Sequence, residues 1–567
     1  MNTPNQRLLL LFFVAFFWSF IAKGQLSATH WISPVHSTEG AGVKQQFLYL
    51  SAPEAAAFQV TITDGAGNPI PGSPFTLSNA NPVRIDLGTN AGTYVTTINT
   101  DLNKPLALNR GLILTASESF YANLRLADAS QGGNLSSKGT LGIGNEFRLG
   151  SFPQGGINHP TAIGFFASVM ATEDNTMVTF DDYNTNVTFL DNVGVGSITD
   201  DVITTMILNA GESYVVAGKY DTTANLDGFI GARVRSNNPI AVNTGTMLGA
   251  TTISGSSRDM GLDQIVASNL IGTEYIVIRG NGTNAMENVM VVATVDNTEI
   301  FVNGAAASIV TINAGEYYVV DAINYTGVTH QNMYIETSAP SYLYQILGGA
   351  PQENSQGMSF IPPLNCNLLK SINLIPAINE IGNTQFQDNG VLITTRTGAT
   401  VTVNGGAPNT NSQAVLGNPD WVTYRLTGLT GNTTIESTEA LSVGLFGTSG
   451  NIGYAGYYSG FGIETQEEEV VACIEEAPFD ILSRIPGNPA GTGTWAPNFA
   501  SGTNIFNPAV DTAGIYVYTL NDCAVTEITV EITIEEVTIG TLSDITLCDD
   551  SLNGVGVEEF DFSTTII

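Results

Sequence analysis

Apolar and polar residues alternate along most of the chain with a period of two. Residues 288–295 (NVMVVATV), 299–302 and 317–320 alternate or run apolar with many β-branched side chains, and Asn, Gly and Asp interrupt such segments every few positions. Side chains of a strand point to alternate faces, and Asn, Gly and Asp favour the turns between strands. Long stretches with the i, i+3, i+4, i+7 spacing of an amphipathic helix do not occur. The pattern therefore predicts an all-β protein.

A short segment with one pattern of apolar and small residues occurs four times. The copies LTASES, VRSNNP, IETSAP and IESTEA end at Ser119, Pro239, Pro340 and Ala440, so they lie 120, 101 and 100 residues apart. Self-similarity at a regular spacing indicates repeated structural units. The sequence therefore predicts four units, at about 25–140, 141–255, 256–355 and 356–465.

Two further motifs recur in the second and third units. The segment ATEDNT at 171–176 matches ATVDNT at 293–298, and LNAGESYVV, which contains Gly211, matches INAGEYYVV, which contains Gly315. Asp-Asn pairs favour tight turns, so the first motif predicts the turn of a hairpin. The second motif predicts a positive φ at its glycine, because glycine lacks the Cβ that excludes this region.

We interpret the four units as tandem β-sandwich-like repeats. A propeller-like closed ring is the alternative, because side-chain alternation does not distinguish a sandwich from a propeller blade. Around residue 465 the composition changes, and residues 466–537 predict an immunoglobulin/PKD-like sandwich in which Trp495 packs near a Cys473–Cys523 disulfide bridge. Residues 538–567 begin another module and stop in mid-pattern, as expected of a truncated chain.

The first residues of the chain predict export. An apolar run from 8 to 21 follows Arg7, and small residues precede Gln25. Such a run is too short for a membrane span of about 20 residues, but it suits the core of a signal peptide. We expect residues 1–24 to be a signal peptide and the mature chain to be secreted to the cell surface without a transmembrane helix.

Composition and charge exclude several classes of partner. The 567 residues include 18 Lys+Arg and 52 Asp+Glu, a formal net charge of -34. Binding to nucleic acid or to an anionic membrane surface needs a cationic patch, which such a chain can hardly form. Only 12% of the residues are charged and 43% are hydrophobic, so the chain carries enough apolar surface to fold.

Four segments resemble a known family. They are similar to the IgGFc-binding protein N-terminal domain, over ATEDNTMVTF (171–180), LNAGESYVV (208–216), ARVRSNNPIAVNTGT (232–246) and DQIVASNLIGTEYIVIRG (263–280). The resemblance is close over about 140–350 and looser over 28–460. It implies adhesion or ligand binding at a cell surface, and it assigns no binding residue.

Other segments resemble one bacterial branch of this family. The openings HWISP, from His30, and FIPPL, from Phe360, look like those of Bacteroidetes proteins. The tail modules resemble repeats of large gliding-motility-associated surface proteins of that phylum, which commonly end in a type IX secretion sorting domain. The resemblance therefore implies a surface protein of this kind.

Constellations of catalytic residues are not found in the sequence. The chain has no HExxH pair, no clean nucleophile elbow and no phosphate-binding glycine loop in a strand-to-helix context. Its histidines are expected to be surface or turn residues; they are His30, His36, His159 and His330. We therefore predict a protein that is not an enzyme and needs no cofactor.

Calcium is the one metal that the sequence makes a candidate. An insertion in the second unit is rich in aspartates, and oxygen-rich loops of this type can bind calcium, although the EF-hand spacing is absent. The residues concerned are Asp181, Asp182, Asp191, Asp200 and Asp201. A solvated hairpin without metal is the interpretation that we favour.

A rare cation lies beside two acids in the link between the second and third units. Arg258, Asp259 and Asp263 occur within RDMGLDQ. An arginine forms directed hydrogen bonds to carboxylates, so we predict that these residues clamp neighbouring units together. Contact with a ligand is the alternative.

Three functions compete for this sequence. The leading hypothesis is a non-enzymatic surface adhesin or ligand-binding protein, which binds an extracellular glycan or glycoprotein through loops of its repeated units. Tyr454, Tyr457 and Tyr458 are candidates for stacking on sugars, although packing between strands is favoured for them. The alternatives are a structural stalk within a larger surface protein and, less favoured, a carbohydrate-active enzyme.

Overall fold

The computed structural model describes residues 25–535, apart from short internal stretches. Those stretches are 37–42, 44, 89–93, 98–105, 108–109, 129, 158–162, 191–196, 200–201, 205–206, 252–257, 349–355, 366–367, 462–464, 486–492, 503 and 522–524. The predicted signal peptide and residues 538–567 lie outside the described residues. The chain divides after residue 463 into a large compact unit, residues 21–463, and a second unit that contains 464–567.

Strands dominate both compact units, which confirms the predicted all-β class. The first two repeat units contain β1 (Ser27–Ile32), β2 (Val35–His36), β3 (Gln45–Ser51), β4 (Phe58–Asp64), β5 (Phe75–Leu77), β6 (Val83–Asp86), β7 (Thr96–Thr97), β8 (Leu106–Ala107), β9 (Leu112–Ala127), β10 (Gly132–Ser136), β11 (Ile143–Arg148), β12 (Ile163–Ala171), β13 (Val178–Asp181), β14 (Ser197–Thr199), β15 (Val202–Thr204), β16 (Ser213–Lys219), β17 (Arg233–Gly249) and β18 (Asp259–Ile265).

The next two repeat units follow the same order of strands. They contain β19 (Gly272–Ile278), β20 (Asn288–Ala293), β21 (Thr298–Val302), β22 (Val310–Ile312), β23 (Tyr317–Val320), β24 (Asn332–Gly348), β25 (Gln356–Phe360), β26 (Ser371–Ile375), β27 (Glu380–Ile381), β28 (Thr384–Gln385), β29 (Asp388–Arg396), β30 (Val401–Val403), β31 (Gln413–Ala414), β32 (Trp421–Thr427), β33 (Thr433–Ser437), β34 (Leu441–Ser449) and β35 (Ile452–Ser459). Short 3-10 helices lie at Gly139–Gly142, Ala224–Leu226, Ser268–Leu270 and Ala322–Asn324.

Each repeat unit is built around one long strand that takes part in two ladders. The first half of β9 pairs with β1 and β4, and its second half pairs with β3 and β10. In the second unit β17 pairs in the same way with β11 and β13, then with β12 and β18. In the third unit β24 does so with β19 and β21, then with β20 and β25. The fourth unit divides the long strand into β33 and β34.

The fourfold sequence motif marks the point at which each long strand changes ladder. The pairing of β1 with β9 shifts register between Ser27 and Thr29, opposite the last residues of LTASES. The first strands of the second and third units shift register in the same way opposite VRSNNP and IETSAP. A proline cannot donate to a ladder and is tolerated at such an irregularity, which explains Pro239 and Pro340 at these positions.

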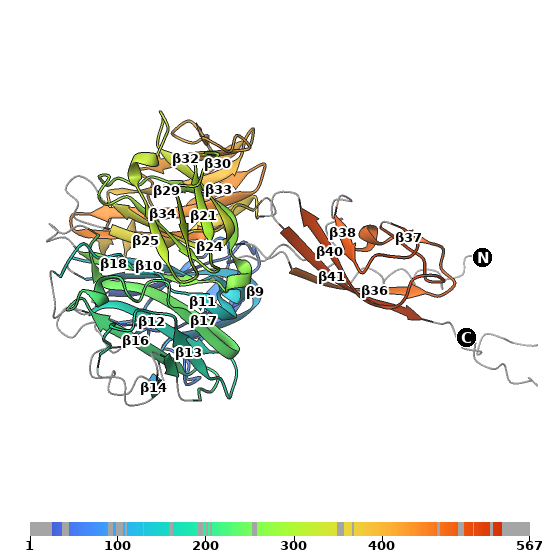
Figure 1. Ribbon diagram of the computed structural model, residues 1–567, viewed down its shortest axis with the longest axis horizontal. Coiled ribbons are helices and arrows are strands. Elements are labelled where there is room, and N and C mark those ends of the chain that lie inside the picture. Colours follow the sequence, from blue (N-terminus) through green and yellow to red (C-terminus); the bar gives the residue numbers. More distant parts are fainter. Residues whose placement is uncertain are drawn as a thin grey trace, which may run out of the picture. The chain divides into compact units, whose positions relative to one another are not determined.

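The four repeat units close into a ring through their last strands, so that the second and third units end with β18 at Ile265 and β25 at Phe360, beyond the predicted boundaries near 255 and 355. These central strands are β10, β18, β25 and β35, and each one forms a hairpin with the long strand before it. Strand β10 contacts β18, β18 contacts β25, β25 contacts β35, and β35 contacts β10. Figure 1 shows β10, β18 and β25 together in the middle of the large compact unit. The units are therefore sandwich-like, as predicted, and are arranged as the closed ring that was the alternative.

The Asp-Asn turns form as predicted, but the prediction that each of them joins the two strands of a hairpin is wrong. Asn175 and Asn297 have positive φ values of 60° and 58°. The strands on either side, β12 and β13, do not pair with each other, and both pair with β17 instead. These turns therefore carry the chain from one ladder of the sandwich to the other. The predicted positive φ at Gly211 and Gly315 is confirmed, at 86° and 79°.

The second compact unit contains a small two-sheet sandwich. Strands β36 (Thr465–Cys473), β41 (Val525–Glu535), β40 (Gly514–Asn521) and β38 (Thr494–Ala496) form one sheet, and β37 (Phe479–Asp480) pairs with β39 (Ile505–Phe506). A 3-10 helix at Ile481–Arg484 joins the core. Trp495 is buried there, with its ring centroid 4.7 Å from that of Tyr518 and 4.8 Å from that of Phe499. Within the described part of the chain, no helix has the length and apolarity needed to cross a membrane.

Candidate functional site

The centre of the ring holds a buried ion pair between two repeat units. Lys138 follows β10 of the first unit, and Asp263 lies on β18 of the second. Lys138 Nζ is 3.0 Å from Asp263 Oδ1, and both side chains are fully buried. On another side the ammonium faces the ring of Phe461, whose centroid lies 5.3 Å away. Burial is the largest influence on both groups: it lowers the pKa of Lys138 and raises the pKa of Asp263.

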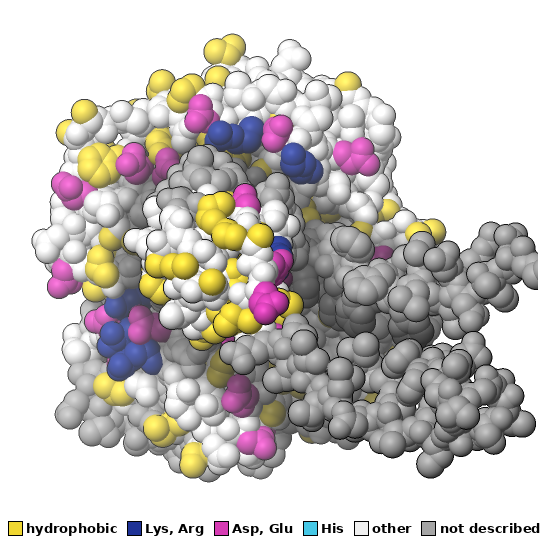
Figure 2. Space-filling view, turned by 90° about the vertical axis from the view of Figure 1, so that its right-hand side faces the viewer, with side chains coloured by type: hydrophobic (Ala, Val, Ile, Leu, Met, Phe, Trp, Pro, Cys, Tyr) yellow, Lys and Arg dark blue, Asp and Glu magenta, His cyan; other side chains and the backbone are white. Residues whose placement is uncertain are grey.

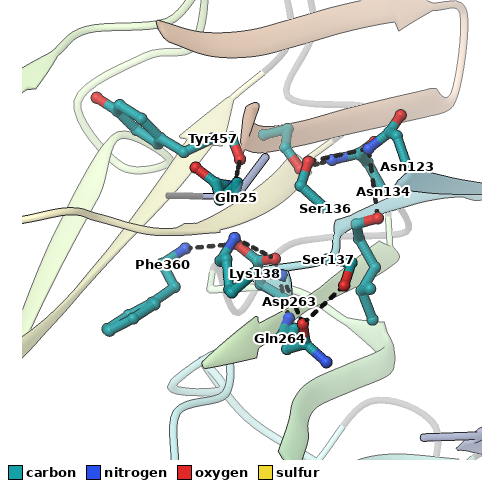
Figure 3. A network of polar contacts seen from close by, with 12 residues as sticks. Gln25, Asn123, Asn134, Ser136, Ser137, Lys138, Asp263, Gln264, Phe360 and Tyr457 are labelled. Carbon is teal, nitrogen blue, oxygen red and sulfur yellow. Dashed lines mark hydrogen bonds and ion pairs between the residues drawn. The ribbon is translucent and has the colours of Figure 1, made fainter. Parts of the chain in front are cut away.

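Asp263 also reaches the third unit. Its Oδ2 accepts a hydrogen bond of 3.1 Å from the backbone N–H of Phe360, at the end of β25. Its Oδ1 accepts a second bond, of 2.9 Å, from the backbone N–H of Gln264. Figure 3 shows Lys138 and Phe360 beside this carboxylate. One buried side chain therefore connects three of the four units.

Asp259 makes the corresponding connection between the first and fourth units. Its Oδ1 accepts a 2.5 Å hydrogen bond from the N–H of Gly132 on β10, and its Oδ2 accepts a 2.6 Å bond from the N–H of Gly453 on β35. Asp259 and Asp263 lie four residues apart on one strand. Strand β18 is therefore the element that holds the ring together by polar contacts.

Uncharged side chains extend this network around the centre. Gln264 accepts from the N–H of Lys138 at 2.6 Å and donates to the carbonyl of Trp31 at 2.7 Å. Asn134 on β10 accepts from Asn123 at 2.7 Å and donates to the carbonyl of Ala455 at 3.3 Å. These side chains are buried, and such groups are tolerated in an interior only when they are hydrogen-bonded. The centre is a polar core and is closed to a soluble ligand.

The predicted clamp residues lie at this centre. Asp259 and Asp263 are both buried in β18, and Arg258 is buried directly before it. The cation that meets Asp263 is Lys138, which belongs to none of the sequence motifs. Burial lowers the pKa of Arg258. The role of Arg258 in the clamp stays a prediction.

The calcium candidates that can be described are bound to arginines. Asp181 Oδ1 accepts from Arg233 at 2.9 Å, and Asp181 Oδ2 pairs with Arg235; Asp182 pairs with Arg148. Burial raises the pKa of Asp181, but the two arginines outweigh it, so that the pKa is lowered overall. Asp191, Asp200 and Asp201 lie outside the described residues. No group of three His, Cys, Asp or Glu side chains that could hold a metal occurs among the residues that the structure describes.

Cys473 is exposed at the end of β36. Cys523 lies outside the described residues, so the bridge between these two cysteines stays a prediction.

Two of the histidines that were expected at the surface or in turns are buried in the ring. His30 Nδ1 bonds to Ser137 Oγ at 2.9 Å, and burial lowers the pKa of His30 to about 4. His36 is also fully buried, and its pKa is lowered to about 3. His330 bonds to Thr423 Oγ1 at 2.9 Å and its pKa is lowered by burial to about 4, and His159 lies outside the described residues. The three described side chains therefore pack in the fold, and none of them belongs to a group of three His, Cys, Asp or Glu among the described residues.

The three tyrosines considered for sugar stacking are also buried. Tyr454, Tyr457 and Tyr458 are each 1 to 2% exposed on β35. Strand β35 lies at the centre of the ring, where both of its faces are covered. These side chains pack between strands, so stacking on a sugar ring is excluded for them.

The outward faces of the units carry rows of side chains at equivalent strand positions. The second residue of the fourfold motif lies on the outer face of each long strand, between one residue on each neighbouring strand. These rows are Thr29, Thr115 and Thr61 in the first unit; Glu146, Arg235 and Thr179 in the second; Glu274, Glu336 and Phe301 in the third; and Ser371, Glu436 and Thr402 in the fourth. The central residue of each row is exposed.

One of these outward faces is hollowed. A shallow cavity of about 550 Å³ lies over β4 and β9 of the first unit, and side chains with hydroxyl or amide groups line it together with Ala57, Phe58 and Ala116. The polar lining residues are Gln59, Thr61, Thr115 and Ser117. Figure 2 shows that charged side chains are sparse on the face in view, where uncharged surface dominates and several Lys and Arg side chains lie beside acids. None of the residues that line the hollow is charged, so the hollow itself is a hydrogen-bonding surface without charge.

Comparisons with known proteins identify a family. No curated protein matches the chain. The solved structure of the N-terminal eight Ig domains of Down Syndrome Cell Adhesion Molecule isoform 1.30.30 is similar at 10% identity and a TM-score of 0.09, with 89% of this chain and 60% of that chain covered. The chain thus spans less than two thirds of that structure. The model of the family described as IgGFc binding protein matches residues 135–447, more than half of the chain. The protein belongs to the IgGFc binding protein family.

Proposed function

We propose that this protein is an exported surface protein that binds an extracellular glycoprotein or glycan without transforming it. The observation that carries the proposal is the divergence of the four outward rows on one repeated frame. The same strand position is Thr115, Arg235, Glu336 or Glu436 in the four units. A rigid scaffold that presents different side chains at equivalent positions suits recognition of a ligand.

The hollow on the first unit is the face that we assign to the ligand. Its row of threonines has no charge, and Gln59 and Ser117 extend its hydrogen-bonding surface. Neutral sugars are recognised by such groups, because a few placed donors and acceptors fix the orientation of a polar ligand. A glycan, free or carried by a glycoprotein, is the ligand whose chemistry fits this face. The family, named for binding to the Fc part of immunoglobulin G, supports a glycoprotein partner.

The closed ring argues against a stalk, and the burial of its central acids argues against a carbohydrate-active enzyme. A stalk gains length when its units follow one another, whereas these four units return on themselves through the contact between β35 and β10. A glycosidase needs two accessible carboxyl groups that face one substrate. Asp259 and Asp263 converge at the centre, but both are fully buried and hydrogen-bonded to other units.

A binding experiment with two matched variants tests the proposal. The full chain is applied to arrays of immobilised neutral glycans and glycoproteins. Thr61→Arg places a long cation in the hollow, and Thr402→Arg makes the same change at the equivalent position of the fourth unit. We expect binding that Thr61→Arg reduces at least tenfold, about 1.4 kcal/mol, and that Thr402→Arg leaves unchanged.

Three outcomes would contradict the proposal. The absence of any retained glycan or glycoprotein would favour the stalk. An equal loss of binding in both variants would indicate that the ligand binds elsewhere than on the first unit. Turnover of a polysaccharide by the purified chain would favour an enzyme.

A further inference from the structure

In the buried pair at the centre of the ring, an amine with few hydrogen bonds lies beside a carboxyl group with several. Lys138 Nζ has one hydrogen-bond acceptor among the described residues, Asp263 Oδ1 at 3.0 Å, and it faces the ring of Phe461 as well. An ammonium group carries three donors, and burial of an ammonium with only one acceptor is costly. Asp263 is surrounded more fully, with backbone donors at both of its oxygens. The amine therefore lies against a carboxyl group that is itself held in place.

We propose that Lys138 and Asp263 condense into an amide bond that joins the first and second units covalently. This site would be an intramolecular isopeptide cross-link, and it does not depend on the function proposed above. Reacting atoms held about 3 to 3.5 Å apart in a fixed orientation gain much of the advantage of an intramolecular reaction. Lys138 Nζ lies 3.0 Å from Oδ1, which is bonded to the carbon that the amine would attack, and both side chains are fully buried.

The condensation needs no partner from outside the chain. The lone pair of the neutral amine of Lys138 attacks Cγ of the protonated carboxyl group of Asp263, and the C–N bond forms. Oδ1 then leaves with its carboxyl proton and one amine proton as water, which breaks the Cγ–O bond. Oδ2 becomes the carbonyl oxygen of the amide. The products are one secondary amide and one water molecule, with no oxidant or reductant involved.

The surroundings of the pair favour each part of this step. Burial disfavours charge, so it lowers the pKa of Lys138 and raises that of Asp263, toward the neutral amine and acid that the reaction requires. The N–H of Phe360 points at Oδ2, where negative charge develops in the tetrahedral intermediate. The ring of Phe461 covers the ammonium and stacks on the ring of Phe360, 5.1 Å away, and both side chains of the pair are fully buried. Water that would favour the reverse reaction is therefore excluded.

The bond would close a loop between two distant parts of the chain. A covalent link between positions 138 and 263 restricts the unfolded ensemble, as a disulfide bridge does. Unlike a disulfide bridge, an amide is unaffected by reduction. A protein pulled by a bound ligand would then keep its first two units together.

Peptide mapping of the purified full chain tests the proposal. The chain is denatured, digested with trypsin and analysed by mass spectrometry. Without a cross-link, trypsin cleaves after Lys138 and releases the linear peptides 126–138, 139–148 and 259–279. With the cross-link, cleavage after Lys138 is lost. Residues 126–148 then appear joined to 259–279, at a combined mass lower by one water molecule.

Two controls make the result decisive. Lys138→Arg retains a cation beside Asp263 but cannot form the amide, so its digest must contain only linear peptides. Lys370, whose exposed ammonium lies 3.6 Å from Glu439, reports on digestion, because peptide 371–396 must appear in every sample. Recovery of 126–138 and 259–279 as linear peptides from the wild-type chain, at the same yield as 371–396, would overturn the proposal and leave the pair as an ion pair.

Discussion

Gly231 of the second repeat unit lies against Gly315 of the third so closely that no side chain fits between them. A Cβ atom on Gly231 would stand 1.9 Å from the carbonyl oxygen of Gly315. Both residues have positive φ, 82° and 79°. Gly65 and Gly211 form a similar contact between the first and second units, where a Cβ on Gly211 would lie 2.1 Å from the Gly65 oxygen. Neighbouring units therefore meet backbone to backbone away from the central strands.

This contact predicts that Gly231→Ala destabilises the ring more than backbone strain alone does. The matched control is Gly428→Ala, since Gly428 has a φ of 71° and no atom within 4 Å of its Cβ position. The control is expected to lose about 1 kcal/mol from the positive φ. Gly231→Ala adds a clash with backbone and is expected to lose about 3 kcal/mol. Equal free energies of unfolding in urea for the two variants would contradict the close contact.

Removal of the Asp259 carboxylate is expected to weaken the closure of the ring. Asp259→Ala leaves the N–H groups of Gly132 and Gly453 without this acceptor in a buried site. Each such group costs about 1 to 3 kcal/mol, so the variant is expected to lose about 2 to 6 kcal/mol of unfolding free energy. Asp174→Ala is the control, because the Asp174 carboxylate lies in an exposed turn and accepts one bond within the described part of the chain, from the N–H of Ala210. Similar losses in both variants would show that the central carboxylate has no special role.

The repeat was predictable because it is local. Alternation with a period of two identifies strands, and the first three copies of the fourfold motif fall where the pairing of the long strand shifts register. The two other motifs have a shared structural role that the sequence suggested only in part. Asp174 Oδ1 accepts from the N–H of Ala210, and Asp296 Oδ1 accepts from that of Ala314, so the turn motif and the glycine motif bind each other in both units.

The closure of the ring was not predictable, because it depends on pairs that are distant in the sequence. Nothing near Asp263 in the sequence indicates that its partner is Lys138 of another unit. The burial of the tyrosines of β35 could not be predicted from the sequence either. Alternation predicts one exposed face for an antiparallel strand, but a strand buried on both faces also carries apolar side chains at every position. Tyr457 and Tyr458 are adjacent and both buried, since β35 lies at the centre of the ring.

Acid is expected to destabilise the ring through its buried histidines. The folded-state pKa values of His30 and His36, about 4 and about 3, lie below the usual 6.5. Between pH 6.5 and each folded-state pKa, the unfolded chain binds protons that the folded chain does not. The histidines therefore cost no stability above pH 6.5, and the free energy of unfolding falls as the pH decreases toward 4 and 3. Each histidine contributes a slope of about 1.4 kcal/mol per pH unit within its own interval.

His36→Leu isolates one of these contributions. The Leu side chain has a similar size and does not titrate, and His36 makes no side-chain hydrogen bond within the described part of the chain. We expect the unfolding free energy of the variant to fall less between pH 6.5 and pH 4 than that of the wild type, by about 3 kcal/mol. Parallel pH profiles of the two proteins would contradict a buried neutral imidazole at this position.

Calcium is expected to leave the stability of the protein unchanged at the candidate aspartates that the structure describes. Asp181 is held by Arg233 and Arg235, and a cation would have to displace both guanidinium groups from its two oxygens. Asp182 is paired with Arg148 in the same region. The midpoint of thermal unfolding should therefore be the same in calcium as in a chelator, both for the wild type and for Asp181→Asn. The midpoint of the variant should be lower than that of the wild type, because its arginines lose a charged partner. A calcium-dependent rise of the midpoint that Asp181→Asn abolishes would show that this carboxylate prefers a metal ion to its arginines.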